Sequence, residues 1–433
     1  MSQRKEFLHY FFESVKGFRC ALLKDAYDDI YSLPETADID LVIDRDDLSA
    51  LLSIINKGKG VVRIKIEKKS FACFVRIFFE DLGYLEIDLL HRFDRKGIIY
   101  KDIDEVLDSC VLNKQGIRAA ALHHQFDYII LFCMLNKADV PEKYQTYFAK
   151  FGQQERSSIF AYITEKYDVH INTLNELYKY NSRHRKKLLK AILSGKQNRV
   201  TGYFWHRLQY LNDVVRERFC NRAIAITFSG VDGAGKSTIL DSVKTQLEIR
   251  YRQPVKVLRH RPSILPILSS MRYGKKKAEQ KAATTLPRLG TNDNPVNSLF
   301  RFGYYYMDFM LGRFYIYLRY TCTGTTVLYD RYYFDFIVDG KRSNISLHPS
   351  LIRLGYVFVS KPEVNFFLYA PENEILKRKQ ELNAADIRTM TDDYMHLFVD
   401  LSGKYKRQRY VTLNNEDLDK TMSTVMKYII SAQ

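Results

Sequence analysis

Eight residues in the second half of the chain narrow the choice of fold more than any others. Residues 230–237 read GVDGAGKS and match the pattern G-x-x-x-x-G-K-[ST]. They follow an apolar, strand-like run at residues 223–228 and precede an amphipathic helical pattern at residues 238–251. Glycines let a backbone wrap closely around a polyphosphate, and the helix that follows adds its positive end. The sequence therefore predicts a phosphate-binding loop on an α/β fold.

The lysine and the serine of this loop have distinct predicted roles. Lys236 is expected to neutralise transferring phosphates, and the Ser237 hydroxyl to bind Mg²⁺. ATP and Mg²⁺ are accordingly the expected cofactors. The predicted cofactor-binding residues of the loop are Gly230, Asp232, Gly233, Ala234, Gly235, Lys236, Ser237 and Thr238.

Strands and helices alternate throughout the rest of this region. Further strands are predicted at residues 255–259, 325–329, 364–369 and 410–413. This alternation is typical of a parallel sheet with helices on both faces. The second of these runs, residues 325–329, leads directly into Asp330 and Arg331. Residues that follow parallel strands face the ligand crevice, so both are expected at the phosphate site, Asp330 also as a metal ligand. A structural salt bridge between the two is the alternative.

These motifs resemble thymidylate kinase. Asp232 in the glycine loop and the triplet Asp-Arg-Tyr at residues 330–332 carry the resemblance, which covers residues 222–433. It implies ATP as donor, magnesium as cofactor, Asp232 near the acceptor, and Arg331 gripping an anionic acceptor group. The predicted catalytic residues are Lys236, Asp330, Arg331 and Asp335.

A lid over the donor phosphates is a further implication of the resemblance. Residues 374–382 lie where that family keeps a mobile lid. Lys377, Arg378 and Arg388 are thereby implied to cover the phosphates of ATP. A basic, solvated helix face is the alternative explanation.

The residues after the triplet differ from the thymidylate kinase pattern and leave the acceptor open. That family has small and amide residues there, whereas residues 333–342 read YFDFIVDGKR. A nucleotide phosphate is already ionised, but a sugar or glycan hydroxyl must lose a proton as it attacks. Asp335 or Asp339 can supply such a base. Helix capping or pairing with Arg342 is the competing role for these two acids.

Three further features precede the triplet. His260 and Arg261 end a predicted strand and are expected to line the crevice. Residues 275–277 form a lysine cluster. Residues 302–320 form an aromatic helix that can stack on a base or sugar ring, with core packing as the alternative.

The amino-terminal region carries a second acidic pattern. Strands predicted at residues 40–43, 61–66 and 84–89 indicate a small α/β or α+β sheet. Asp38 and Asp40 are separated by one residue and point to the same side of a strand, where an acid on an adjacent strand completes a two-metal site.

This pattern resembles the nucleotidyltransferase superfamily over residues 18–92. The resemblance implies that Asp38 and Asp40 hold metal ions and that Asp88 assists the nucleophile. The Gly-Ser turn of that family is missing, and Lys24 is the residue that can replace it as a phosphate ligand. A second enzyme and a repurposed binding domain both remain open.

Three regions follow from these patterns: a nucleotidyltransferase-like α+β domain at residues 1–105, a helical bundle at 106–220, and a P-loop kinase-like domain at 221–433 whose parallel sheet is flanked by helices. Apolar residues recur at helical spacing in the second region, as at Phe126, Ile129 and Cys133. The basic run at the end of this region is interpreted either as a solvated helix face or as an anion-binding surface.

The composition of the chain limits which binding partners and which cellular location are expected. The formal charge of +17 favours phosphates, nucleic acid or anionic lipid, and nucleic acid is possible but not favoured. Six cysteines occur without a CxxC pair, which favours a cytoplasmic location. No run reaches the roughly 18 apolar residues of a membrane-spanning helix. A homodimer is possible.

The function predicted is an ATP-dependent phosphotransferase that acts on a nucleoside or nucleotide-like molecule or on a sugar hydroxyl. The alternatives are a kinase for a glycan or surface polysaccharide, and a bifunctional enzyme whose amino-terminal half transfers nucleotidyl groups. A third alternative is an ATP-binding regulator or nucleic-acid-binding protein without catalytic activity.

Overall fold

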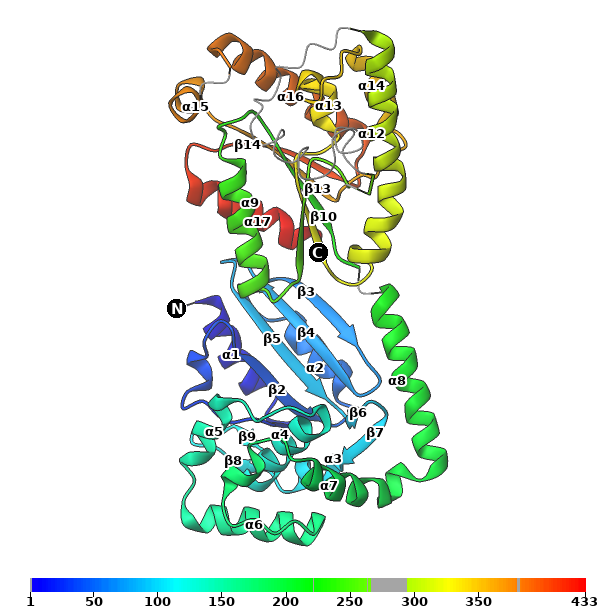
Figure 1. Cartoon of the computed structure of the whole chain (residues 1–433). Coiled ribbons are helices and arrows are strands. Elements are labelled where there is room, and N and C mark those ends of the chain that lie inside the picture. The colour runs from blue at the N-terminus through cyan, green and yellow to red at the C-terminus, as the bar shows by residue number, and fades with distance from the viewer. Residues whose placement is uncertain (1, 221, 263, 266–293, 380–381) are drawn as a thin grey trace. The chain divides into compact units, whose positions relative to one another are not determined.

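The computed structural model describes residues 2–220, 222–262, 264–265, 294–379 and 382–433. The chain divides into two compact units, Met1–Arg216 and Glu217–Gln433, each of which is described by itself (Figure 1). The predicted boundary at residue 105 lies inside the first unit and stays a prediction. The lysine cluster at residues 275–277 lies outside the described residues.

The first unit is built on a mixed seven-stranded sheet with the order β3-β4-β5-β2-β1-β9-β8. Its strands are β1 (Cys20–Leu22), β2 (Asp38–Ile43), β3 (Val61–Lys68), β4 (Ala72–Phe79), β5 (Tyr84–Leu90), β8 (Val111–Leu112) and β9 (Arg118–Ala119). The strands predicted at residues 40–43, 61–66 and 84–89 are confirmed. A separate hairpin pairs β6 (Phe93–Arg95) with β7 (Ile98–Lys101). The parallel pair β2 and β5 places Asp40 level with Asp88.

Helices cover both faces of this sheet. One core packs α1 (Gln3–Ser14) and α2 (Leu48–Asn56) against it, and it includes Leu41 of β2. The next residue, Val42, belongs to the opposite core, as the period of two along a strand requires. Helix α3 (Ile103–Asp108) lies between β7 and β8. The helices after β9 are α4 (Leu122–Asn136), α5 (Glu142–Ala149), α6 (Gln153–Tyr167), α7 (Ser182–Ser194) and α8 (Val200–Cys220), the last of which crosses the boundary between the units.

The predicted helical region is thus largely helical, with two exceptions. The strands β8 and β9 lie within it and were not predicted. Each has only two residues, which is too short to show the alternation on which strand prediction depends. The second core of the unit joins residues on both sides of residue 105, from Ala21 to Ile192.

The second unit is built on a five-stranded sheet with the order β11-β12-β10-β13-β14. All neighbouring strands run parallel. The strands are β10 (Ala225–Ser229), β11 (Val255–Arg259), β12 (Thr326–Asp330), β13 (Val364–Tyr369) and β14 (Arg409–Asn414). The predicted parallel sheet is confirmed, and each predicted strand lies within two residues of the observed one.

Helices flank this sheet on both faces (Figure 1). The helices α9 (Lys236–Thr245) and α17 (Leu418–Ala432) pack together, with α9 on β10 and β12. The opposite core joins α12 (Pro295–Ile316), α13 (Phe334–Val338), α14 (Pro349–Gly355) and α16 (Ala384–Lys404). Helix α15 (Glu372–Arg378) follows β13, and single π turns extend α9 and α12.

The predicted aromatic helix is α12. Phe302 and Phe309 lie in the core, which agrees with the core-packing alternative for these two rings. Phe300 and Phe314, in contrast, are exposed. Among the described residues, no helix combines the length and the hydropathy that crossing a bilayer requires.

Candidate functional site

The glycine-rich loop joins the central strand β10 to the start of α9, as predicted. Gly230 has φ of 150°, and a Cβ atom there would lie 2.2 Å from the carbonyl oxygen of Leu368 on the neighbouring strand. Gly235 has φ of 82°, and a Cβ atom there would lie 2.4 Å from Nδ2 of Asn415. Only glycine fits at both positions, because both the backbone angle and the available space exclude a side chain.

Lys236 is folded back into its own loop. Its Nζ donates a hydrogen bond of 2.8 Å to the carbonyl oxygen of Val231. The same Nζ lies 3.9 Å from a carboxylate oxygen of Asp232. Burial lowers the pKa of Lys236 to about 7. The ammonium group is therefore weakly stabilised here, and an anionic ligand in the loop would stabilise its charged form.

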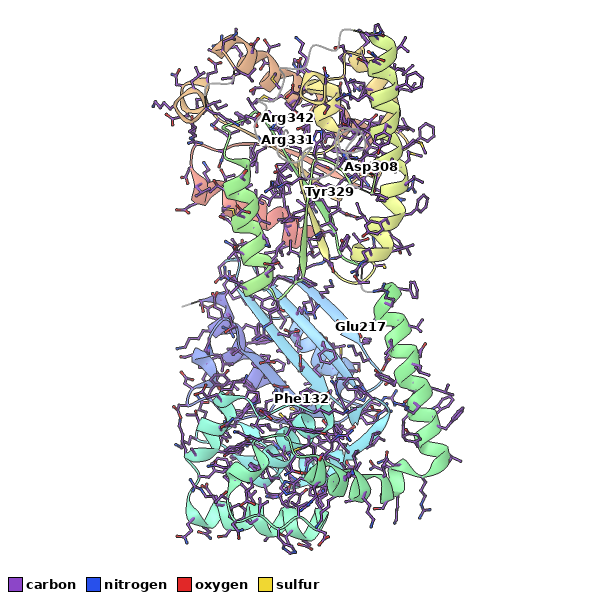
Figure 2. All side chains as sticks on the ribbon, viewed as in Figure 1. Phe132, Glu217, Asp308, Tyr329, Arg331 and Arg342 are labelled. Atoms are coloured by element: carbon purple, nitrogen blue, oxygen red, sulfur yellow. The ribbon has the colours of Figure 1, made fainter. Side chains whose placement is uncertain are left out.

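Asp232 holds two arginines through its two carboxylate oxygens. Oδ1 accepts a hydrogen bond from Arg331, and Oδ2 accepts one from Arg342. Although burial acts to raise the pKa of Asp232, these cations, Arg331 foremost, hold it well below the usual value. Figure 2 labels both arginines, which lie beside each other in this unit.

Arg331 lies directly after β12 in a left-handed conformation, with φ of 73°. A non-glycine residue rarely adopts this angle, and such residues concentrate at functional sites. Its guanidinium also lies 2.5 Å from Oδ2 of Asp335, which is buried in α13. The ion pairs of Arg331 are therefore with Asp232 and Asp335, whereas the alternative from sequence was a pair with Asp330.

The environment of Asp335 bears on its predicted role as a base. Burial acts to raise its pKa, but the ion pair with Arg331 holds the pKa below the usual value. A carboxylate with a depressed pKa is a weak proton acceptor. Asp339 ends α13, where its amide donates to the carbonyl oxygen of Asp335.

Several buried polar atoms of this unit have no hydrogen-bond partner within the part of the chain that the structure describes. They include Ser229 Oγ and Asn415 Oδ1. Ser229 immediately precedes the loop, and Asn415 contacts the loop through its Nδ2. Buried polar atoms without partners are uncommon and mark positions where water or a ligand completes the structure.

Helix α15 lies over the loop, and its basic residues differ in position. A Cβ atom on Gly233 would lie 3.2 Å from Cγ2 of Ile375, and Nη1 of Arg378 lies 3.5 Å from the carbonyl oxygen of Gly233. Lys377 instead pairs with Glu374 at 2.8 Å. The structure thus brings Arg378, but not Lys377, to the loop.

Arg388 belongs to α16 rather than to the segment over the loop. It makes two hydrogen bonds, of 2.7 and 3.0 Å, to the carboxylate of Glu372 at the start of α15. Residues 380–381 of the predicted lid lie outside the described residues.

The predicted ligands of Mg²⁺ lie on adjacent elements. Ser237 is exposed in the first turn of α9, as is Thr238. Asp330 is the last residue of β12, the strand that pairs with β10. A hydroxyl and a carboxylate are oxygen ligands of the kind that Mg²⁺ prefers, so the residues present suit this ion.

His260 follows β11 as Arg331 follows β12. It also has a left-handed backbone, with φ of 63°, and its Nε2 lies 3.1 Å from Oγ of Ser343. Burial lowers the pKa of His260 to about 4, so the ring is neutral at neutral pH. The next residue, Arg261, pairs at 2.8 Å with the buried Asp308 of α12, and the same carboxylate accepts hydrogen bonds from the amides of Ile264 and Leu265.

Sequence reasoning missed two residues at this site. Arg342 was considered only as a partner of Asp335 or Asp339, whereas its Nη1 binds Asp232. Asn415 follows β14 and donates a hydrogen bond of 2.9 Å to the carbonyl oxygen of Ala234. The available signal for Asn415 was its place after a parallel strand, where ligand-facing residues gather.

The three acids of the first unit also come together. One carboxylate oxygen from each of Asp38, Asp40 and Asp88 lies within 4.8 Å of the others. They border a cavity of about 480 Å³. Burial and the nearby Asp40 raise the pKa of Asp88 to about 8. Lys24 lies with its Nζ 2.6 Å from Oδ2 of Asp40. Although burial acts to lower it, Asp40 holds the pKa of Lys24 well above its usual value.

Comparison of the chain with protein-family models finds no match, and comparison with curated proteins finds none either. Among solved structures, the chain is similar to thymidylate kinase from Ehrlichia chaffeensis, with 19% identity, coverage of 48% of this chain and 97% of that chain, and a TM-score of 0.31. It is also similar to thymidylate kinase from Candida albicans, with 18% identity, coverage of 48% of this chain and 91% of that chain, and a TM-score of 0.31. Similarity this low does not indicate an activity for this chain.

Proposed function

We propose that the second unit is an ATP-dependent phosphotransferase. The observation that carries the proposal is the loop at residues 230–237, with its obligatory glycines, its buried lysine and the helix that begins at its end. This arrangement presents backbone N–H groups and a helix amino terminus to a polyphosphate. An acceptor oxygen would attack the γ-phosphorus of ATP as the bond to the ADP oxygen breaks.

Each residue of the loop has a role in this proposal. Lys236 would leave the carbonyl oxygen of Val231 and donate to the phosphate oxygens, where negative charge accumulates. Ser237 and Asp330 would hold Mg²⁺, which when bound neutralises phosphate charge. Arg378 is placed to approach the donor phosphates from α15.

The proposed acceptor is a phosphomonoester, such as a nucleoside monophosphate. The carboxylate of Asp232 pairs with the guanidinium groups of both Arg331 and Arg342. The planar arrangement of N–H donors in a guanidinium group matches the oxygens of a phosphate. A phosphate acceptor needs no base, because it is already ionised at neutral pH. The depressed pKa of Asp335 favours this acceptor over a sugar or glycan hydroxyl.

Incubation of the purified chain with γ-labelled ATP tests the activity and its acceptor together. The panel contains nucleoside monophosphates, nucleosides, sugars, sugar phosphates and glycans. We expect label to pass to a phosphomonoester, and Lys236→Ala to reduce the rate by roughly 100-fold or more, as loss of one transition-state donor does. Lys244→Ala is the matched control, because Lys244 lies on the exposed side of the same helix.

The outcomes separate the competing functions. Label on a nucleoside, sugar or glycan hydroxyl would reject the proposed acceptor but retain the phosphotransferase. ATP binding without any labelled product from the panel would instead support the non-catalytic alternative. Cytoplasmic location and a homodimer remain predictions from the sequence.

A further inference from the structure

The carboxylate cluster of the first unit already contains a cation. Asp38, Asp40 and Asp88 converge on adjacent strands as a two-metal site would require. However, the Nζ of Lys24 lies 2.6 Å from Oδ2 of Asp40, and the Asp40 side chain is 6% exposed. This distance is that of a short charge-assisted hydrogen bond.

An ammonium group and a divalent ion compete for such a carboxylate. Mg²⁺ binds carboxylate oxygen at about 2.0–2.1 Å and demands nearly octahedral geometry. An ion bound to Asp40 would therefore share its ligand with a positive charge in contact with the same carboxylate, and Coulomb repulsion between the two cations would weaken its binding. The residues present thus fit a divalent ion only if Lys24 moves away.

The position of Lys24 is fixed by more than its ion pair. The amide of the preceding residue, Leu23, donates a hydrogen bond of 2.8 Å to the carbonyl oxygen of Asp40. The Nζ also lies 5.9 Å from the ring centre of Tyr128 and 5.8 Å from that of Tyr144. Backbone pairing and two aromatic rings therefore hold the ammonium group against the cluster.

We propose that the Lys24 ammonium group is the resident cation of this carboxylate cluster and that no divalent metal ion binds there in the native protein. The lysine then has a structural and electrostatic role, in place of the phosphate-ligand role expected from the sequence. The first unit would accordingly not act as a metal-dependent nucleotidyltransferase. This inference does not depend on the proposed activity of the second unit.

Binding of Mn²⁺ to the full-length protein, without nucleotide, tests the proposal. Free Mn²⁺ is counted by electron paramagnetic resonance in the wild type, Asp40→Asn, Lys24→Met and the double variant Lys24→Met/Asp40→Asn. Lys69→Met is the matched control, because Lys69 borders the same cavity but pairs with Glu67 at 3.2 Å.

We expect Asp40→Asn to leave the Mn²⁺ stoichiometry of the wild type unchanged. Lys24→Met should gain one Mn²⁺ site in this unit. Its affinity should be at least about tenfold higher than that of any Mn²⁺ binding to this unit of the wild type. The double variant should lack this site. Mn²⁺ should also raise the thermal unfolding temperature of Lys24→Met but not that of Lys69→Met, because binding to the native state stabilises it.

Two results would overturn the proposal. A loss of one Mn²⁺ site in Asp40→Asn would show that the native cluster already binds a divalent ion, and this test does not require Lys24→Met to fold. A folded Lys24→Met protein that gains no site would show that the lysine does not stand in place of a metal ion.

Discussion

The side chain of Asn415 donates a hydrogen bond of 2.9 Å to the carbonyl oxygen of Ala234, although the two residues are 181 positions apart. Asn415 is buried, and its backbone N–H donates a hydrogen bond to the carbonyl oxygen of Tyr369. The ends of two parallel strands are thereby connected to the glycine-rich loop. The shape of the loop thus depends on a residue near the end of the chain.

Asn415→Ala should loosen this loop. We expect the free energy of unfolding of the second unit to fall by about 1 kcal/mol for the lost hydrogen bond, and the Kd for ATP to rise severalfold. Calorimetry measures both. Asn414→Ala is the control, because Asn414 is exposed and its side chain donates to Glu416, two residues away, at 3.1 Å. Equal effects of the two variants on ATP binding would contradict the role of Asn415.

ATP binding should take up a proton at about pH 8, because burial holds the pKa of Lys236 at about 7 in the free protein. Bound triphosphate favours the ammonium form and raises this pKa, so the neutral lysine must gain a proton on binding. Below about pH 6 the lysine is already charged and this uptake vanishes. Titration calorimetry in two buffers with different ionisation enthalpies measures the number of protons.

Substitution distinguishes the contribution of Lys236 to this proton uptake from the contributions of other titrating groups. Lys236→Met should remove the proton uptake at about pH 8, whereas Lys244→Met should retain it, because the Lys244 side chain is 42% exposed and does not belong to the loop. If Lys236→Met binds ATP with the wild-type uptake, another group takes the proton and the assignment to Lys236 is wrong.

Two glycine substitutions should have opposite effects on stability. Gly230→Ala places a methyl group 2.2 Å from a backbone oxygen of Leu368, at φ of 150°. We expect a loss of at least roughly 1–3 kcal/mol from backbone strain and the disappearance of ATP binding. Gly303→Ala adds a methyl group to α12 with no atom within 4 Å, and should stabilise the helix by about 0.5–1 kcal/mol. Thermal unfolding compares the two.

Asp308 should be a major contributor to the stability of the second unit. This buried carboxylate accepts hydrogen bonds from Arg261 at 2.8 Å and from the amides of Ile264 and Leu265, each at 2.9 Å. Asp308→Ala removes the buried carboxylate that pairs with the Arg261 guanidinium, which costs about 3–5 kcal/mol.

The exposed pair of Asp400 and Arg353 supplies the comparison for Asp308, since its distance is also 2.8 Å. Asp400→Ala should cost no more than about 1 kcal/mol, because solvent screens an exposed ion pair. Hydrogen exchange of amides in the second unit measures both losses. Similar values for the two variants would show that burial does not amplify the effect of Asp308.

The parallel sheet and the loop were predictable because their signals are local. The loop motif needs only eight consecutive residues between a strand and a helix, and buried strands such as β10 and β13 appear as short apolar runs. The position of Arg331 also followed from the rule that ligand-facing residues come after parallel strands.

The partners of these residues were not predictable, because distant segments supply them. Arg342 reaches Asp232 across 110 positions, and Lys24 meets Asp40 only when β1 and β2 are paired. The predicted lid placed Lys377 and Arg378 together, yet adjacent helical residues point in different directions and only Arg378 meets the loop. Sequence spacing does not determine such contacts without the tertiary fold.

The two ion pairs of Asp232, with Arg331 and with Arg342, have a thermodynamic consequence for binding. Immobilising a long side chain on binding costs about 0.5–1.5 kcal/mol of conformational entropy. Here folding itself has already restricted both arginines, so an arriving anion meets a rigid template. Such a receptor discriminates by shape from the first encounter, and Asp232 would govern selectivity without touching the molecule it selects.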